Sequence, residues 1–291
     1  MRRALILGER HGATVVVLHV IADDRGSRRA QEHSRRACRL LEDWYGPSEK
    51  RRALRLHIRV AVGGVARTIA DVATLHRADL LVFGGSRRSS MRPALLGSLV
   101  ETVIGATGLP ALVVKRPPLH PYRRILLGAA SKESTLRAIT AAAELELFDD
   151  VDLRIVRAFT TPGPTRVAVA DLDATEAADY RARAAVDAHA GVTAFLAGSE
   201  AGGLHRAIHV VEGSPDTVVC RAAEAFDTEL VVIGASRAAL VTRALFGSVA
   251  GEIIDRASCD VLAVPPPRLG RGEDVVRAAE APYPTRCSRA A

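Results

Sequence analysis

Residues 209–267 read HVVEGSPDTVVCRAAEAFDTELVVIGASRAALVTRALFGSVAGEIIDRASCDVLAVPPP. Short apolar runs, such as Leu230–Ile233 and Val261–Val264, are bounded by Gly or Pro and alternate with Ala-, Arg- and Glu-rich segments of helical period. This alternation is typical of β-α-β units, in which helices join parallel strands. Ser214, Pro215 and Asp216 predict a helix start, with Ser as N-cap, Pro at the first helical position and an acid on the positive end of the dipole. The stretch therefore predicts an α/β fold with a parallel sheet.

The pattern occurs twice in the chain. Leu80–Gly84 (LLVFG) aligns with Leu230–Gly234 (LVVIG), an offset of 230 minus 80, or 150 residues. Further upstream, Ala13–Val20 aligns with Val151–Ala158 at 151 minus 13, or 138. The difference predicts a longer loop in the second copy, around residues 160–173. In that copy we expect strands at Arg124–Leu127, Leu153–Ala158, Ala207–Val211, Glu229–Ile233 and Val261–Val264.

The smaller offset places Met1 opposite Ile139, inside the first helix of the second copy. The first copy then has no counterpart of the strand expected at Arg124–Leu127. Losing a central strand would leave the backbone groups of its neighbours unpaired. We therefore expect the given chain to begin about 15 to 20 residues after the start of the first copy.

Length and composition agree with two globular domains. The 291 residues fit two domains of about 145 each, and 48% hydrophobic with 25% charged residues excludes long disorder. We place the domains at residues 1–116 and 122–267, followed by a tail, 268–291, without a clear strand. No apolar stretch is long enough for a membrane span.

The charge distribution and the cysteine spacing argue against several classes of partner and site. The net charge is +7, but acids are interleaved with the arginines, and 4% aromatic residues give single-stranded nucleic acid few stacking partners. We expect no nucleic-acid or membrane partner, and interpret the basic segment Arg25–Arg39 as a solvated helix face. Four widely spaced cysteines argue against zinc and against a disulfide framework, and favour a cytoplasmic location.

Each copy also carries one motif: a strand, Gly-x-Ser-Arg, nine residues, Gly-Ser, then a helix. Its residues are Gly84, Ser86, Arg87, Gly97 and Ser98 in the first copy, and Gly234, Ser236, Arg237, Gly247 and Ser248 in the second. Glycine lets the backbone approach a ligand, and the helix N-terminus favours a phosphate. Alternatively, Ser98 and Glu101 form a capping box that needs no ligand.

The motif resembles the universal stress protein family, whose nucleotide-binding members carry G-x-x-G, nine residues, then G-S or G-T after the fourth strand. The resemblance covers residues 4–116 and 122–267 and is strongest at residues 209–267. It implies two tandem Rossmann-like domains, each a five-stranded parallel sheet of order 3-2-1-4-5 with helices on both faces, the first copy lacking its first strand. It also implies pairing of the two domains within the chain, with a homodimer as a further option.

The resemblance implies a nucleotide site where the strand order reverses, at the carboxyl ends of the strands. In the second copy the implied residues are Ala130, Ser131, Ala158, Ile233, Gly234, Ser236, Arg237, Gly247, Ser248 and Val249. In the first copy they are Gly84, Ser86, Arg87, Gly97 and Ser98. The implied ligand is ATP or AMP, with Mg²⁺ only alongside the nucleotide.

Two departures from the family bear on this site. Arg87 and Arg237 stand where nucleotide binders have the second glycine, and an arginine either clamps a phosphate or fills its space. The aspartate at the end of the family's first strand is missing, since Gly128–Ser131 contains no acid. The second copy is therefore the better candidate site.

Other catalytic motifs are incomplete. A nucleophile elbow would need glycine at Arg88 or Ala238. His205 and His209 have zinc spacing only on a helix, and on a strand they lie about 13 Å apart, so we interpret them as solvated. We expect a stress-response protein that binds adenine nucleotide or signals, without strong catalysis. The alternatives are a non-nucleotide interaction or regulatory module, and a detached soluble regulatory part of a transporter.

Overall fold

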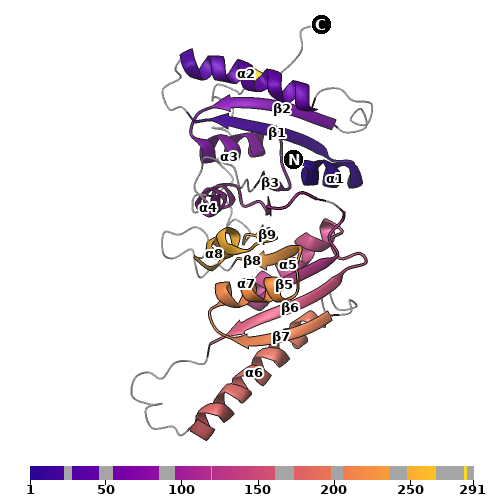
Figure 1. Ribbon diagram of the computed structural model, residues 1–291, viewed down its shortest axis with the longest axis vertical. Coiled ribbons are helices and arrows are strands. Elements are labelled where there is room, and N and C mark those ends of the chain that lie inside the picture. The colour runs from indigo at the N-terminus through magenta and orange to yellow at the C-terminus, as the bar shows by residue number, and fades with distance from the viewer. Residues whose placement is uncertain are drawn as a thin grey trace. The chain divides into compact units, whose positions relative to one another are not determined.

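The computed structural model describes residues 1–22, 28–45, 55–84, 96–118, 120–160, 174–197, 206–235, 248–266 and 285–286 (Figure 1). The chain forms two compact units. The first comprises Met1–Val82, Thr102–Leu109 and Pro267–Ala291, and the second comprises Phe83–Glu101 and Pro110–Pro266. The second unit thus includes part of the first sequence copy.

A seven-stranded sheet forms the second unit's framework, in the order β3-β4-β9-β8-β5-β6-β7. The strands are β3 (Leu81–Gly84), β4 (Ala111–Val114), β5 (Arg124–Ala129), β6 (Asp152–Phe159), β7 (Arg206–Glu212), β8 (Leu230–Gly234) and β9 (Asp260–Val264). All five strands expected in the second copy are present, and their pairings are parallel. Their order, β9-β8-β5-β6-β7, is the predicted 3-2-1-4-5 read from the other edge.

Helices cover both faces of this sheet. α5 (Lys132–Glu144) and α6 (Ala174–Leu196) contact each other, as do α7 (Pro215–Ala225) and α8 (Ser248–Arg256). β5, β8 and β9 are central and apolar, and Leu126, Val231 and Leu262 are fully buried. α7 begins at Pro215 with Ser214 as N-cap, as predicted, although the Ser214 side chain makes no capping hydrogen bond.

The final strands of the two copies pair with each other. β4 runs antiparallel to β9, and Leu112 lies opposite Leu262. The paired residues of both strands are fully buried: Ala111, Leu112 and Val113 in β4, and Val261, Leu262 and Ala263 in β9. They are buried because both strands lie inside the seven-stranded sheet, with a strand on each side. The second unit is therefore a continuous sheet that joins both copies.

The first unit contains α1 (Arg2–Arg10), β1 (Thr14–Ile21), α2 (Arg28–Tyr45), β2 (Arg55–Val62) and α3 (Val65–Leu75). α4 (Leu96–Thr107) belongs partly to each unit. β1 and β2 are parallel, in a sheet of order β1-β2-β10. β1 and β2 are the second and third strands of the first copy, whereas β3 and β4, its fourth and fifth, lie in the other sheet. Among the described residues of the first copy, α1 is the element before β1, and no strand precedes it.

Two expectations about the chain were wrong. The tail does contain a strand, β10 (Thr285–Arg286), which pairs antiparallel with β2 and sets Thr285 opposite Val60. Cys38, in α2, is disulfide-bonded, although the spacing of the cysteines argued against disulfides. Sequence spacing is a poor guide here because a disulfide requires proximity in space only.

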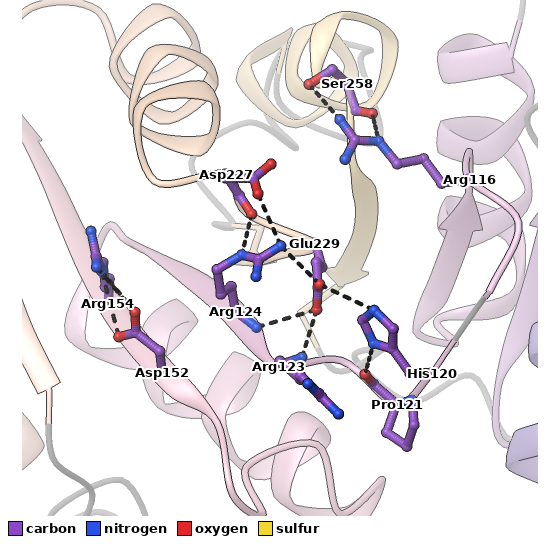
Figure 2. Close-up of polar contacts among 10 residues, drawn as sticks. All are labelled: Arg116, His120, Pro121, Arg123, Arg124, Asp152, Arg154, Asp227, Glu229 and Ser258. Carbon is purple, nitrogen blue, oxygen red and sulfur yellow. Dashed lines mark hydrogen bonds and ion pairs between the residues drawn. The ribbon is translucent and has the colours of Figure 1, made fainter.

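Glu229 and Asp260, at the amino ends of β8 and β9, accept hydrogen bonds from the segment that connects β4 to β5. Glu229 accepts hydrogen bonds from the backbone N–H of Arg123 at 2.6 Å and from the Arg124 guanidinium at 3.0 Å (Figure 2). Asp260 accepts from the backbone N–H groups of Lys115 and Arg116, at 2.8 and 3.1 Å. These bonds satisfy backbone donors that are exposed at Arg123 and part-buried at Lys115 and Arg116. They lie at the amino ends of the strands, opposite the carboxyl ends where the ligand site is predicted.

None of the helices within the described ranges combines the length and apolar character that a membrane crossing requires.

Candidate functional site

The candidate site begins at the loop after β5, the first strand of the second copy. Ser131 is the N-cap of α5, and its Oγ accepts a hydrogen bond from the backbone N–H of Ser134. The Thr135 hydroxyl accepts from the N–H of Ala130 at 3.0 Å and donates to the carbonyl of Ser131 at 2.8 Å. Side chains of the first helical turn therefore fix the backbone of the loop.

The end of β8 lies directly against this turn. The register pairs Gly128 of β5 with Ile233 of β8, one residue before Gly234. A Cβ atom on Gly234 would overlap the carbonyl oxygen and carbon of Ser134. Only glycine permits this approach, so the motif glycine has a packing role whether or not a ligand binds.

Two arginines bring positive charge to the same edge. The guanidinium of Arg137, on α5, donates to the carbonyl of Ala235 at 2.6 Å and pairs with Glu133 at 3.0 Å. Its Nε is buried and has no hydrogen-bond partner within the described ranges. Arg157 of β6 donates to the carbonyl of Ala129 at 3.4 Å. The loop after β5 itself carries no acid, so Arg157 and the part of the Arg137 charge that Glu133 does not offset are available to an anionic ligand.

The structure brings together several predicted residues of the second copy and leaves others undescribed. Ala130, Ser131, Ile233 and Gly234 lie around the ends of β5 and β8, Ala158 lies near the end of β6, and Ser248 and Val249 begin α8. Ser236, Arg237 and Gly247 lie outside the described residues, as do Ser86 and Arg87 of the first copy. The arginines of the motif therefore stay predictions.

In the first copy, Gly84 ends β3, and Gly97 and Ser98 lie in the first turn of α4. The capping box expected from Ser98 and Glu101 is wrong, because α4 begins at Leu96 and Ser98 is inside it. The backbone N–H of Gly97 instead donates to Asp255 Oδ1 of α8 at 2.9 Å. An acid of the second copy thus meets the motif glycine of the first.

A cavity of about 330 Å³ lies elsewhere, between β6, β7 and α7, and its lining includes none of the predicted site residues. His209 borders it, with its ring centroid 4.7 Å from that of Phe226. Its Nε2 is buried without a hydrogen-bond partner in the described part of the chain. His209 is therefore not the solvated side chain that we expected, and His205 lies outside the described residues. We place the candidate site at the ends of β5 and β8 because backbone, hydroxyl and guanidinium groups converge there, whereas the cavity is mainly apolar.

No cluster of three or more His, Cys, Asp or Glu side chains suited to a metal ion occurs among the residues that the structure describes.

The sequence did not identify Arg137, Arg157 or Asp255. Arg137 follows Glu133 by one helical turn, which is a spacing typical of an ordinary surface pair. Arg157 lies in a strand with two other charged residues, Asp152 and Arg154, so its sequence position does not set it apart. Asp255 contacts Gly97, which lies 158 residues earlier in the sequence. Local sequence patterns do not predict which strand end or helix terminus these side chains contact in the folded protein.

Known proteins resemble this chain in both sequence and fold. The sequence profile of the Universal stress protein family matches residues 1–115 and 121–265. A universal stress protein of Methanocaldococcus jannaschii is 31% identical over 87 residues, which are 30% of this chain and 46% of that protein. The match thus spans about half the length of this relative.

Solved structures share the fold over most of the chain. A universal stress protein from Archaeoglobus fulgidus aligns with a TM-score of 0.59 and 17% identity, over 90% of each chain. A protein of unknown function from Pseudomonas aeruginosa PAO1 aligns with a TM-score of 0.58 and 18% identity, over 96% of this chain and 92% of that one. The family profile covers both copies, and the strand order of the second copy is the one that the resemblance implies. The chain therefore belongs to the universal stress protein family, with two of the family's domains in tandem.

Proposed function

We propose that the second copy binds an adenine nucleotide, ATP or AMP, and that the protein acts in stress signalling rather than in catalysis. One observation carries the proposal. At the point where strand order reverses, the ends of β5 and β8 meet at Gly234, with the guanidinium groups of Arg137 and Arg157 on the same edge. Ser248 of the Gly-Ser motif begins α8, whose N-terminus favours a phosphate.

The second copy is favoured over the first because its sheet is complete. A nucleotide bound at a strand-order reversal contacts the ends of both central strands. In the second copy these are β5 and β8. In the described part of the first copy, β3 is the equivalent of β8, and no equivalent of β5 is seen. Mg²⁺ would enter only with the nucleotide, held by its phosphates.

Calorimetric titration of ATP and of AMP, each with Mg²⁺, into the full chain tests this proposal. We expect one site per chain, and weaker binding by Arg237→Gly if that arginine clamps a phosphate. Arg87→Gly is the matched control, because it makes the same change in the first copy and should leave the affinity unchanged. Equal weakening by both variants would show that the effect is one of net charge and not of the site.

An interaction module without nucleotide is the second candidate, and the contact of Arg137 with Ala235 favours it. A guanidinium that already bonds the end of β8 can occupy the space that a phosphate would need. Absence of heat with the parent protein, together with binding by Arg237→Gly or Arg137→Ala, would support this candidate and contradict nucleotide binding.

A further inference from the structure

Two carboxylates of the second unit approach glycine backbones of the opposite copy. Asp255 Oδ1, on α8, accepts from the Gly97 N–H at 2.9 Å. A Cβ atom built on Gly97 would lie 2.6 Å from Asp255 Oδ2. On the other side, a Cβ atom on Gly251 of α8 would overlap Glu101 Oε1 of α4. Both glycines are needed for the carboxylates to come this close.

The contact at Gly97 falls on the position that the Gly-Ser motif assigns to a phosphate. α4 begins at Leu96, so the Gly97 N–H is one of the four that have no partner within the helix. These N–H groups and the positive end of the dipole are what a helix N-terminus offers to an anion. In this protein the anion at Gly97 is the side chain of Asp255.

The first copy has no acid at the position equivalent to Asp255. The offset of 150 residues pairs Asp255 with Gly105 of α4, and Gly97 with Gly247. Glycine has no side chain that could reach the second copy's motif. The two motif helices therefore meet different acids: Asp255 accepts from the Gly97 N–H of α4, whereas Glu101 accepts from the backbone of Gly251, four residues after Gly247.

We propose that the Asp255 carboxylate is an internal substitute for phosphate, which fills the anion position of the first copy and excludes external phosphate groups there. The inference rests on the proposed function, because it assigns nucleotide binding to the second copy alone. An external anion at Gly97 would have to displace a carboxylate already bonded to the same N–H. It would also face the charge of that carboxylate, and like charges at one site oppose binding strongly.

The test follows the Gly97 backbone amide by NMR in the ¹⁵N-labelled full chain, with inorganic triphosphate as the probe. In the parent protein we expect no triphosphate-dependent shift of this amide. In Asp255→Ala the shift should appear, with an affinity at least about 100-fold above any residual binding by the parent. Asp255→Asn keeps the size and removes the charge, so it serves as a second variant if the alanine variant does not fold.

Asp179→Ala is the charge-matched control, since Asp179 is an exposed residue of α6 and this variant should behave like the parent. A triphosphate-dependent shift of the Gly97 amide in the parent would overturn the proposal. So would its absence in both Asp255 variants when they are folded, because Asp255 would then be only a structural contact between α4 and α8.

Titration of the same proteins with ATP separates this inference from the proposed function. A parent that binds no ATP, together with an Asp255 variant whose Gly97 amide responds to triphosphate, would contradict nucleotide binding in the second copy and support the role of Asp255. One ATP bound per parent chain, together with an unresponsive Gly97 amide in the folded variants, would support nucleotide binding in the second copy. It would contradict the role proposed for Asp255.

Discussion

The hydroxyl of Tyr122 donates to Asp260 Oδ2 at 2.7 Å, and both residues are buried. Tyr122 lies in the connection between the copies, and Asp260 begins the last strand of the second copy. The same carboxylate accepts the backbone N–H groups of Lys115 and Arg116 through Oδ1. Asp260 thus binds both ends of the segment between β4 and β5, at Lys115 and Arg116 and at Tyr122.

We expect removal of this acid to destabilise the protein far more than removal of the hydroxyl. Tyr122→Phe removes one hydrogen bond to a charged group, which should lower the free energy of unfolding by about 1.5 to 3 kcal/mol. Asp260→Ala leaves three donors without their acceptor and should lower it by more. Urea unfolding measures both values. Tyr180→Phe, in an exposed position on α6, should change little, and equal losses in the two tyrosine variants would contradict the bond's role.

Gly234 and Gly84 form a matched pair, because they occupy the same motif position in the two copies. Gly234→Ala should lower the unfolding free energy by about 1 to 3 kcal/mol, since the new methyl group overlaps backbone atoms of Ser134. Gly84→Ala should change it by less than about 0.5 kcal/mol, because a Cβ atom there has no neighbour within 4 Å among the described residues. Thermal unfolding compares the two variants, and similar losses would show that the contact between Gly234 and Ser134 is not a constraint.

The buried cysteines should resist thiol reagents in the native protein. Burial raises the pKa of Cys259 to about 11 and also raises the pKa of Cys220. At pH 8 only about one Cys259 thiol in a thousand is then ionised, and the thiolate is the reactive form. With Cys38 in a disulfide, the unfolded, unreduced protein should show two reactive thiols. After reduction it should show all four cysteines. A count of four before reduction would contradict the disulfide.

Glu101 predicts a pH dependence of stability. Burial and the negative charge of Asp255 raise its pKa, against the lowering effect of a hydrogen bond from the Gly251 backbone. Above the ordinary carboxyl pKa the native state then holds more protons than the unfolded state. The free energy of unfolding should therefore fall as pH rises from that ordinary value through the raised one.

Glu101→Gln should remove this part of the pH profile, so its stability relative to the parent should be higher at pH 7 than at pH 4. Urea unfolding across this range measures the difference. Glu144→Gln, in an exposed position on α5, is the control and should keep the parent profile. A parallel shift of the Glu101→Gln curve at all pH values would contradict the role of the titration.

The sequence alone determined the fold class, the repeat and the strand order. Apolar runs such as Val231–Ile233 are rich in β-branched residues and predict buried parallel strands. Because the pattern repeats at an offset of 150 residues, the corresponding segment of the other copy supports the same prediction. The fold class and the repeat follow from local periodicity and from comparison of the chain with itself, whereas the strand order came from the resemblance to the family.

Only the tertiary structure decided the contacts that bear on function. It placed Asp255 at Gly97, Arg137 at Ala235 and β10 on the edge of β2. Each contact joins residues that are distant in sequence, and each depends on where a helix or strand end lies and not on the residues next to it. A periodic pattern reports which face of an element is buried, but the partner of a polar side chain at that face is fixed only when the chain has folded.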